Sequence, residues 1–263
     1  MRGWPIAVRL ESLGQPFREA LETAARLGFQ GVEFDAVGDL SPASLTQTGR
    51  REVQFLLRRH GLRLVALGFP TRRGYEYLDR LDVRIEATVA AMLLAYDLGA
   101  GLVINQLGII PPVEDEAKRM ILRESLSRLS NEGDRVGARI AFQTGSDSPA
   151  ALAELLGSVA NSGLAINLAP ASLVTAGEDL EGAIEKLAPW IAGVHVRDIV
   201  RSPLASAGVR EVSMGEGEID WRRLLRVLDM VDGCRHLTIV REPAAGSEAA
   251  ISKAKGYVES LIG

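Results

Sequence analysis

Apolar residues follow two alternating patterns along the chain. Residues 6–10 form a short run rich in β-branched side chains, whereas the apolar residues of segment 17–27 recur at positions i, i+3, i+4, i+7 and i+10. The first pattern is typical of a buried strand and the second of one face of a helix. Pro16 and Gly28 flank the second segment, where residues that begin and end a helix are expected. The sequence therefore begins with a predicted strand–helix unit.

This unit recurs along the whole chain. The apolar positions of a later segment, Ile85, Val89, Met92, Leu93 and Tyr96, predict a helix face that ends near Gly99, and a last helix is predicted over residues 247–261. The predicted strands cover residues 6–10, 31–35, 62–67, 102–105, 139–142, 164–167, 191–196 and 237–240. Strands that alternate with helices indicate a parallel sheet. The count of eight, with no Gly-x-Gly-x-x-Gly turn after the first strand, favours a closed (β/α)8 TIM barrel over an open sheet. We expect one domain over residues 1–263.

Length and composition agree with this fold and exclude several classes of protein. The chain has 263 residues, of which 47% are hydrophobic and 24% charged, and a complete barrel takes about 250 residues. A net charge of −4 predicts no nucleic-acid partner, because such partners require a basic face. No long apolar stretch or leader pattern is visible, so we expect no membrane contact and a cytoplasmic location. The lone Cys234 agrees with a reducing compartment. The sequence shows no apolar stripe that identifies an interface, and it leaves open whether the protein forms a homo-oligomer.

The predicted fold indicates where catalytic residues would lie, because the active site of a (β/α)8 barrel is at the carboxyl ends of its strands. His195, Asp198 and Glu242 are the candidate acid–base residues there, and a histidine titrates nearest to neutral pH. The candidate substrate-binding residues are Arg72, Arg73, Asn105, Gln143 and Arg201. Paired arginines match a phosphate or carboxylate, but Arg72 and Arg73 are equally explained as solvated loop residues.

Other polar residues near the strand ends have two readings each. Asn105 either binds sugar hydroxyls or caps the following loop. Glu33 and Asp35 point to one side of their strand, where they either act as an acid–base pair or form an ion pair with Arg9. His60 and His236 are expected on the surface, away from the strand ends.

Three phrases carry a family resemblance: Leu-Gly-Phe-Gln-Gly-Val-Glu at 27–33, Gly-Val-His-Val-Arg-Asp at 193–198, and Gly-Glu-Gly-Glu-Ile-Asp-Trp at 215–221. With these phrases the chain resembles the xylose-isomerase-like TIM-barrel superfamily of sugar-phosphate isomerases and ketose 3-epimerases. The resemblance implies a small sugar or sugar phosphate as substrate. It also implies a divalent cation held by Glu, Asp, His and Glu at the ends of strands five to eight, which polarises the substrate for proton transfer.

The residues at those four positions differ from the family pattern. They are Gln143, Ala169, His195 and Val240, so only the histidine is kept. An amide brings no negative charge and the two apolar side chains bring no ligand atom, whereas Mg²⁺ and Mn²⁺ prefer carboxylates. We therefore expect no bound metal and no other cofactor. Glu242 lies on the same side of its strand as Val240, so it is the one carboxylate that could replace a missing ligand.

Two functional hypotheses follow. The first is a sugar isomerase or epimerase that works weakly or without a metal. The second is a catalytically silent barrel that binds a sugar, polyol, sugar acid or partner protein in the cavity where the resemblance implies an active site. Endonuclease-like activity is less favoured, because it needs a cluster of metals, and the chain has three histidines, of which one ends a strand.

Overall fold

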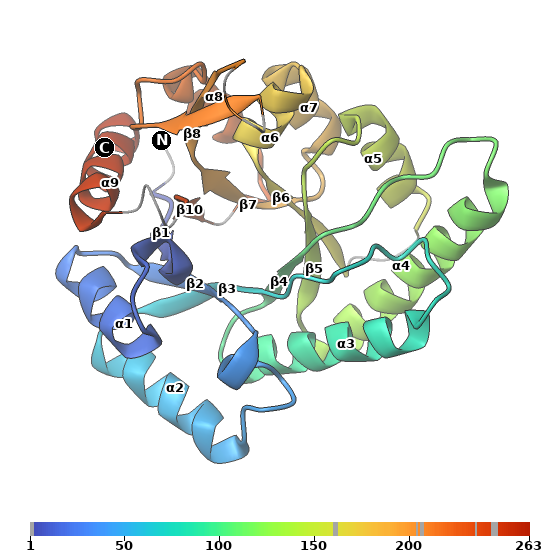
Figure 1. Cartoon of the computed structure of the whole chain (residues 1–263), viewed down its shortest axis with the longest axis horizontal. Helices are drawn as coiled ribbons and strands as arrows, with labels where there is room; N and C mark the ends of the chain where they lie inside the picture. The colour runs from blue at the N-terminus through green and yellow to red at the C-terminus, as the bar shows by residue number, and fades with distance from the viewer. Residues whose placement is uncertain (1–2, 160–162, 204, 206–207, 235, 243–246) are drawn as a thin grey trace.

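A computed structural model describes residues 3–159, 163–203, 205, 208–234, 236–242 and 247–263 of the chain. Its described residues form a closed barrel of parallel strands (Figure 1). The strands are β1 (Ile6–Arg9), β2 (Gly31–Asp35), β3 (Arg63–Gly68), β4 (Leu102–Asn105), β5 (Arg139–Gln143), β6 (Leu164–Leu168), β7 (Ile191–Val196) and β10 (Leu237–Ile239). They are ordered β1-β10-β7-β6-β5-β4-β3-β2, and β1 closes the barrel by pairing with both β2 and β10. The predicted (β/α)8 barrel is confirmed.

Helices surround the barrel (Figure 1). They are α1 (Phe17–Arg26), α2 (Gln47–Arg59), α3 (Leu81–Asp97), α4 (Glu116–Val136), α5 (Pro149–Gly157), α6 (Pro170–Ala176), α7 (Leu180–Leu187), α8 (Trp221–Leu228) and α9 (Glu248–Ile262), with short 3-10 turns at Leu10–Leu13 and Gly38–Leu40. Side chains that accept a hydrogen bond from the first turn begin several of them: Thr46, Asp115, Ser148, Asp179, Asp220 and Ser247. These residues satisfy backbone N–H groups that have no partner within the helix. In the described ranges no helix combines the length and hydropathy that crossing a bilayer requires.

The predicted apolar face of α3 is only partly correct. Ile85 and Met92 are buried as expected, but Leu93 and Tyr96 are 42% and 59% exposed. Leu94, which the pattern did not select, is fully buried. The helix is apolar on several sides, so its sequence has no single stripe that marks the face toward the barrel.

A two-stranded antiparallel hairpin, β8 (Asp198–Arg201) with β9 (Val209–Val212), follows β7 and was not predicted. Asp198 connects this hairpin to the glycine-rich segment 215–221. One of its carboxylate oxygens accepts hydrogen bonds from the backbone N–H groups of Gly215 at 2.9 Å and Gly217 at 3.1 Å. A Cβ atom at Gly217 would lie 1.9 Å from the carboxylate, so only glycine fits there. Burial raises the pKa of Asp198, although its backbone donors oppose that shift. Asp198 therefore positions the loop after the hairpin.

His236 corrects an expectation, because it is buried rather than on the surface. It precedes β10 and is 4% exposed, and its ring packs over Gly193, where a Cβ atom would lie 2.5 Å from Nε2. The apolar β-strand pattern alone does not show that the residue before a strand faces the barrel interior. Burial lowers the pKa of His236 to about 4, so the folded chain keeps this imidazole neutral at neutral pH.

The buried His236 predicts an acid-sensitive contribution to stability. Between its ordinary pKa of 6.5 and its folded value of about 4, the unfolded chain binds a proton that the folded chain does not, so stability falls as the pH falls. Across that window we expect the free energy of unfolding to drop by about 2–3 kcal/mol more in the wild type than in His236→Gln. Urea unfolding at a series of pH values measures both slopes, and equal slopes would contradict the assignment.

Candidate functional site

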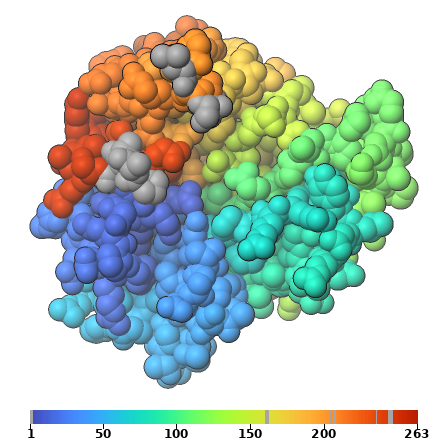
Figure 2. All heavy atoms as spheres, viewed as in Figure 1, coloured from blue at the N-terminus to red at the C-terminus, as the bar shows by residue number. Residues whose placement is uncertain are grey.

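A polar cavity of about 230 Å³ opens at the carboxyl ends of the strands. Its lining includes Gln143, Ala169, His195 and Val240, so the four strand-end positions singled out in the sequence converge on one space. The other lining residues are Arg9, Glu11, Ser12, Ala171, Ser172, Arg197, Arg241 and Glu242. In Figure 2, the N-terminal segment in blue and the C-terminal segment in red lie against each other, as the pairing of β1 with β10 requires. The cavity thus collects residues from both ends of the chain.

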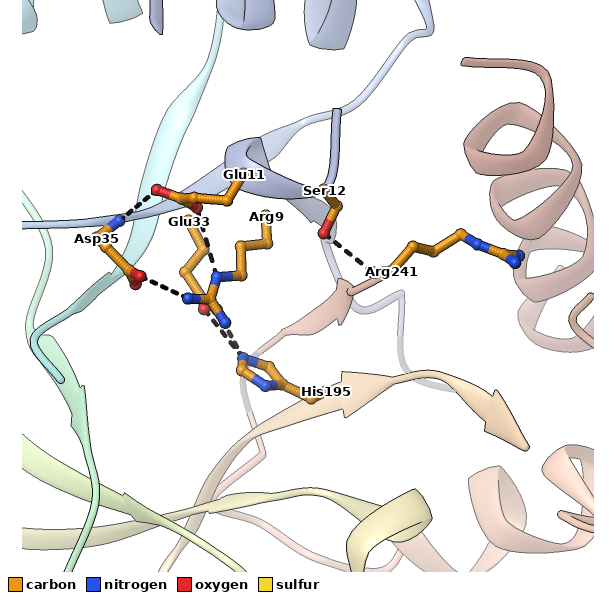
Figure 3. Close-up of polar contacts among 7 residues, drawn as sticks. All are labelled: Arg9, Glu11, Ser12, Glu33, Asp35, His195 and Arg241. Carbon is orange, nitrogen blue, oxygen red and sulfur yellow. Dashed lines mark hydrogen bonds and ion pairs between the residues drawn. The ribbon is translucent and has the colours of Figure 1, made fainter. Parts of the chain in front are cut away.

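His195 contacts Glu33 across the barrel. Its Nε2 atom lies 3.0 and 2.9 Å from the two carboxylate oxygens, and the side chains are only 6% and 1% exposed (Figure 3). An ionised carboxylate accepts hydrogen bonds and cannot donate them, so the contact favours the tautomer with a proton on Nε2 and a lone pair on Nδ1. The sequence could not indicate this contact, because β2 and β7 are separated by more than half of the chain.

The charge of Glu33 is maintained by its surroundings. Burial acts to raise its pKa, but the facing His195 and the nearby Arg9 outweigh burial, and the pKa lies below its ordinary value. The folded protein therefore holds a carboxylate in its interior. A buried charge of this kind requires a partner, since removal from water is costly.

Arg9 forms the ion pair that one reading of the sequence expected, with Asp35. Their side chains lie 2.6 Å apart, and Arg9 Nε lies 3.4 Å from Glu11 (Figure 3). Glu11 in turn accepts a hydrogen bond of 2.8 Å from the backbone N–H of Asp35. Burial, followed by the proximity of Asp35, raises the pKa of Glu11 despite its backbone donors and Arg9. Glu33, expected in the same ion pair, instead contacts His195.

Two further arginines lie beside the cavity. Arg197 forms an ion pair of 3.0 Å with Glu242, whose side chain is 62% exposed. Arg241 points away from His195 (Figure 3), and its Nε atom lies 2.8 Å from Glu211 of the β8–β9 hairpin, with both side chains nearly buried. Glu211 also accepts a hydrogen bond of 2.9 Å from the backbone N–H of Glu242. The hairpin thereby fixes the chain segment that carries Arg241 and Glu242.

Asn105 and four other predicted site residues lie outside the lining of this cavity. Arg72 and Arg73 are exposed in the loop after β3, where Arg73 lies 2.8 Å from Asp79, in agreement with solvated loop arginines. Arg201 lies on the hairpin, and its guanidinium donates a hydrogen bond of 3.3 Å to the carbonyl of Val174. Asp198 faces the glycine-rich loop described above. The structure therefore does not bring these four residues together at the cavity.

Asn105 is buried and holds the loop after β3. Its amide nitrogen donates to the Tyr75 hydroxyl at 2.9 Å, and its carbonyl oxygen accepts from the Thr71 hydroxyl at 3.1 Å and from the backbone N–H of Gln106 at 2.6 Å. The loop-capping reading of Asn105 therefore fits the structure. Asn105 lies outside the lining of the 230 Å³ cavity but borders a smaller neighbouring one together with Arg9, Gln143 and His195.

The described part of the chain holds no group of three or more His, Cys, Asp or Glu side chains placed to bind a metal ion. Glu242, the candidate replacement ligand, instead pairs with Arg197 at the rim of the cavity. Within the cavity, His195 directs Nε2 at Glu33.

A parallel eight-stranded barrel with a polar cavity at the carboxyl ends of its strands has the architecture of a (β/α)8 enzyme. A family model of the xylose isomerase-like TIM barrel matches residues 21–259. The chain belongs to this family.

Solved structures from several bacteria share the fold. A xylose isomerase domain protein from Planctomyces limnophilus is 20% identical, with a TM-score of 0.83 and coverage of 98% of this chain and 96% of that chain. A xylose isomerase-like TIM barrel protein from Mycobacterium smegmatis, in complex with magnesium, is 16% identical, with a TM-score of 0.78 and coverage of 98% and 96%. A D-allulose 3-epimerase from Methylomonas sp., in complex with D-allulose, is 15% identical, with a TM-score of 0.78 and coverage of 98% and 97%. A search of curated proteins found no match.

The contact between Glu33 and His195 predicts a large stability effect. Because Glu33→Ala removes the partner of a buried group, we expect it to lower the free energy of unfolding by about 3–5 kcal/mol. The double variant Glu33→Ala/His195→Ala should lose less than the two single variants together, since neither group is then left unpaired. Denaturant unfolding measures all three.

Glu248→Ala is the matched control for Glu33→Ala. It breaks the exposed ion pair between Arg26 and Glu248, and we expect a far smaller loss because exposed pairs add little. Comparable losses for Glu33→Ala and Glu248→Ala would contradict a stabilising role for the buried contact.

Proposed function

We propose that this protein binds a sugar, or a polyol or sugar acid derived from one, in the cavity at the carboxyl ends of its strands, and that it does so without a divalent cation. One observation carries the proposal: three of the four strand-end positions that line the cavity hold an amide, a methyl and an isopropyl group, in Gln143, Ala169 and Val240. At the fourth position, His195 directs Nε2 at Glu33, which leaves Nδ1 as its nitrogen with a lone pair. A single imidazole nitrogen without carboxylates from the other three positions is a poor site for Mg²⁺ or Mn²⁺.

The size and polarity of the cavity favour a small hydroxylated ligand. Its volume of about 230 Å³ lies below the roughly 300 Å³ at which pockets for drug-sized ligands begin. Ser12, Ser172 and Gln143 line it, and their hydroxyl and amide groups both donate and accept hydrogen bonds, as sugar hydroxyls do. The D-allulose complex of the epimerase with the same fold supports a ligand of this class.

The residues present do not fit the cation that the family pattern implies. Mg²⁺ and Mn²⁺ are bound mainly by carboxylates and water, and Gln143, Ala169 and Val240 supply no carboxylate. Metal-assisted isomerisation is therefore not part of the proposal. Asp198, a sequence candidate for acid–base chemistry, is assigned instead to positioning the loop after the hairpin.

Acid–base catalysis by His195 without a metal is a second candidate. It is favoured by the contact with Glu33, because a buried carboxylate both orients an imidazole and stabilises its protonated form. Turnover of a ketose or aldose in the presence of EDTA, lost in His195→Gln, would support this candidate. Ligand binding without turnover would instead support a catalytically silent barrel that only binds its ligand.

Restoring the family's ligands tests the placement of the old metal site. We expect Gln143→Glu/Ala169→Asp/Val240→Glu to bind Mn²⁺ at least about tenfold more tightly than the wild type, since carboxylates are the preferred ligands of such ions. Isothermal titration with MnCl₂ measures both affinities, and the same triple variant with His195→Ala is the control. Near-stoichiometric Mn²⁺ binding by the wild type, lost on His195→Ala, would contradict cation-free binding.

Ligand binding itself is expected to be independent of metal. For any sugar, polyol or sugar acid that binds, the dissociation constant should be the same in EDTA and in excess Mg²⁺ or Mn²⁺, because no ligand oxygen coordinates a cation. Calorimetry under the three conditions measures this constant. An affinity that requires the metal would refute the proposal.

A further inference from the structure

The charged residues that line the cavity differ in how firmly they are held. Arg9 lies 2.6 Å from Asp35, whose side chain is only 14% exposed. Arg241 and its partner Glu211 are 10% and 7% exposed. Both guanidinium groups thus pair with carboxylates that are themselves buried or part-buried, and these ion pairs link neighbouring segments at the rim of the barrel.

Arg197 is held differently. Its partner, Glu242, is 62% exposed, while Arg197 itself is 29% exposed. Exposed ion pairs add little to stability, because water screens them and their long side chains lose freedom when they pair. A competing anion can therefore replace Glu242 on Arg197 at small cost, whereas replacing Glu211 on Arg241 would require breaking a nearly buried pair.

The position of Arg197 directs it toward a ligand. Arg197 lies two positions after His195, directly beyond the end of β7, and alternation places both side chains on the same side of the chain. Both line the cavity. The neighbouring walls at Gln143, Ala169 and Val240 carry no negative charge. An anion bound to Arg197 would therefore not be repelled by the side chains of these three residues.

Glu11 is the other acidic side chain in the lining. Its oxygens already contact Arg9 and the backbone N–H of Asp35, and burial raises its pKa. Glu242 is the more exposed of the two, at 62% against 38% for Glu11, and it pairs with the guanidinium group that a ligand would use.

We propose that Arg197 is the anion-binding residue of this cavity, and that the ligand is an anionic sugar derivative whose carboxylate or phosphate displaces Glu242 from Arg197. Guanidinium binds both groups through paired hydrogen bonds. This assignment rests on the proposed sugar-binding function. It narrows the class of ligand to anionic sugar derivatives.

Matched ligands separate charge from shape. Isothermal titration in EDTA compares D-gluconate with D-glucitol, and D-ribose 5-phosphate with D-ribose. We expect the anion of at least one pair to bind about tenfold more tightly than its neutral partner, and this advantage to shrink as NaCl is raised, because salt screens exposed charges. The pair with the larger ratio distinguishes a sugar acid from a sugar phosphate.

Two variants test the residues. Arg197→Gln should abolish the anion's advantage, whereas Glu242→Gln should increase it by about two- to fivefold, the range that corresponds to removing one exposed competitor. Arg223→Gln, which breaks an exposed ion pair of 2.8 Å with Glu181 on the neighbouring helices, is the matched control and should keep the wild-type ratio.

The outcomes distinguish the two proposals. Equal affinities for anionic and neutral partners, or weaker anion binding in Glu242→Gln, would overturn the role of Arg197 while sugar binding stands. If none of the four compounds nor other sugars and polyols bind, the proposed function fails as well.

Discussion

The chemistry of this barrel depends on one contact, between the buried carboxylate of Glu33 and the imidazole of His195. It joins β2 to β7 across the interior, where a charge without a partner would be too costly to retain. Glu33 accepts from one ring nitrogen of His195 and so orients the imidazole. Arginine side chains and hydroxyl groups line the cavity beside it, and our proposal of a cation-free site rests on this lining.

The rest of the cavity agrees with that contact. Gln143, Ala169 and Val240 surround His195 and add no negative charge that would attract a cation. The positive charge comes instead from guanidinium groups, of which Arg9 and Arg241 have firmly held carboxylate partners. In our proposal a guanidinium group supplies the positive charge that a metal ion supplies in the family pattern, and the ligand carries the negative charge.

Sequence patterns predicted the barrel well because each strand and helix is defined by its own apolar periodicity. They also placed Gln143, Ala169, His195 and Val240 together, since the ends of parallel strands meet at one rim. Contacts between side chains across the barrel could not be predicted. The partner of Glu33 lies on β7, and the burial of His236 depends on the space above Gly193, neither of which a local pattern encodes. The role of Asp198 likewise depends on a loop that folds back onto it.

The response of both His195 ring nitrogens to metal is the most direct test of this account. In protein labelled with ¹⁵N-histidine, nitrogen–proton NMR correlations distinguish a protonated from an unprotonated imidazole nitrogen, and a His195→Gln variant assigns the signals. The account predicts a protonated Nε2 at neutral pH and an Nδ1 resonance that does not move when Mg²⁺ or Zn²⁺ is added. An Nδ1 resonance that moves and saturates as the metal is titrated would contradict it.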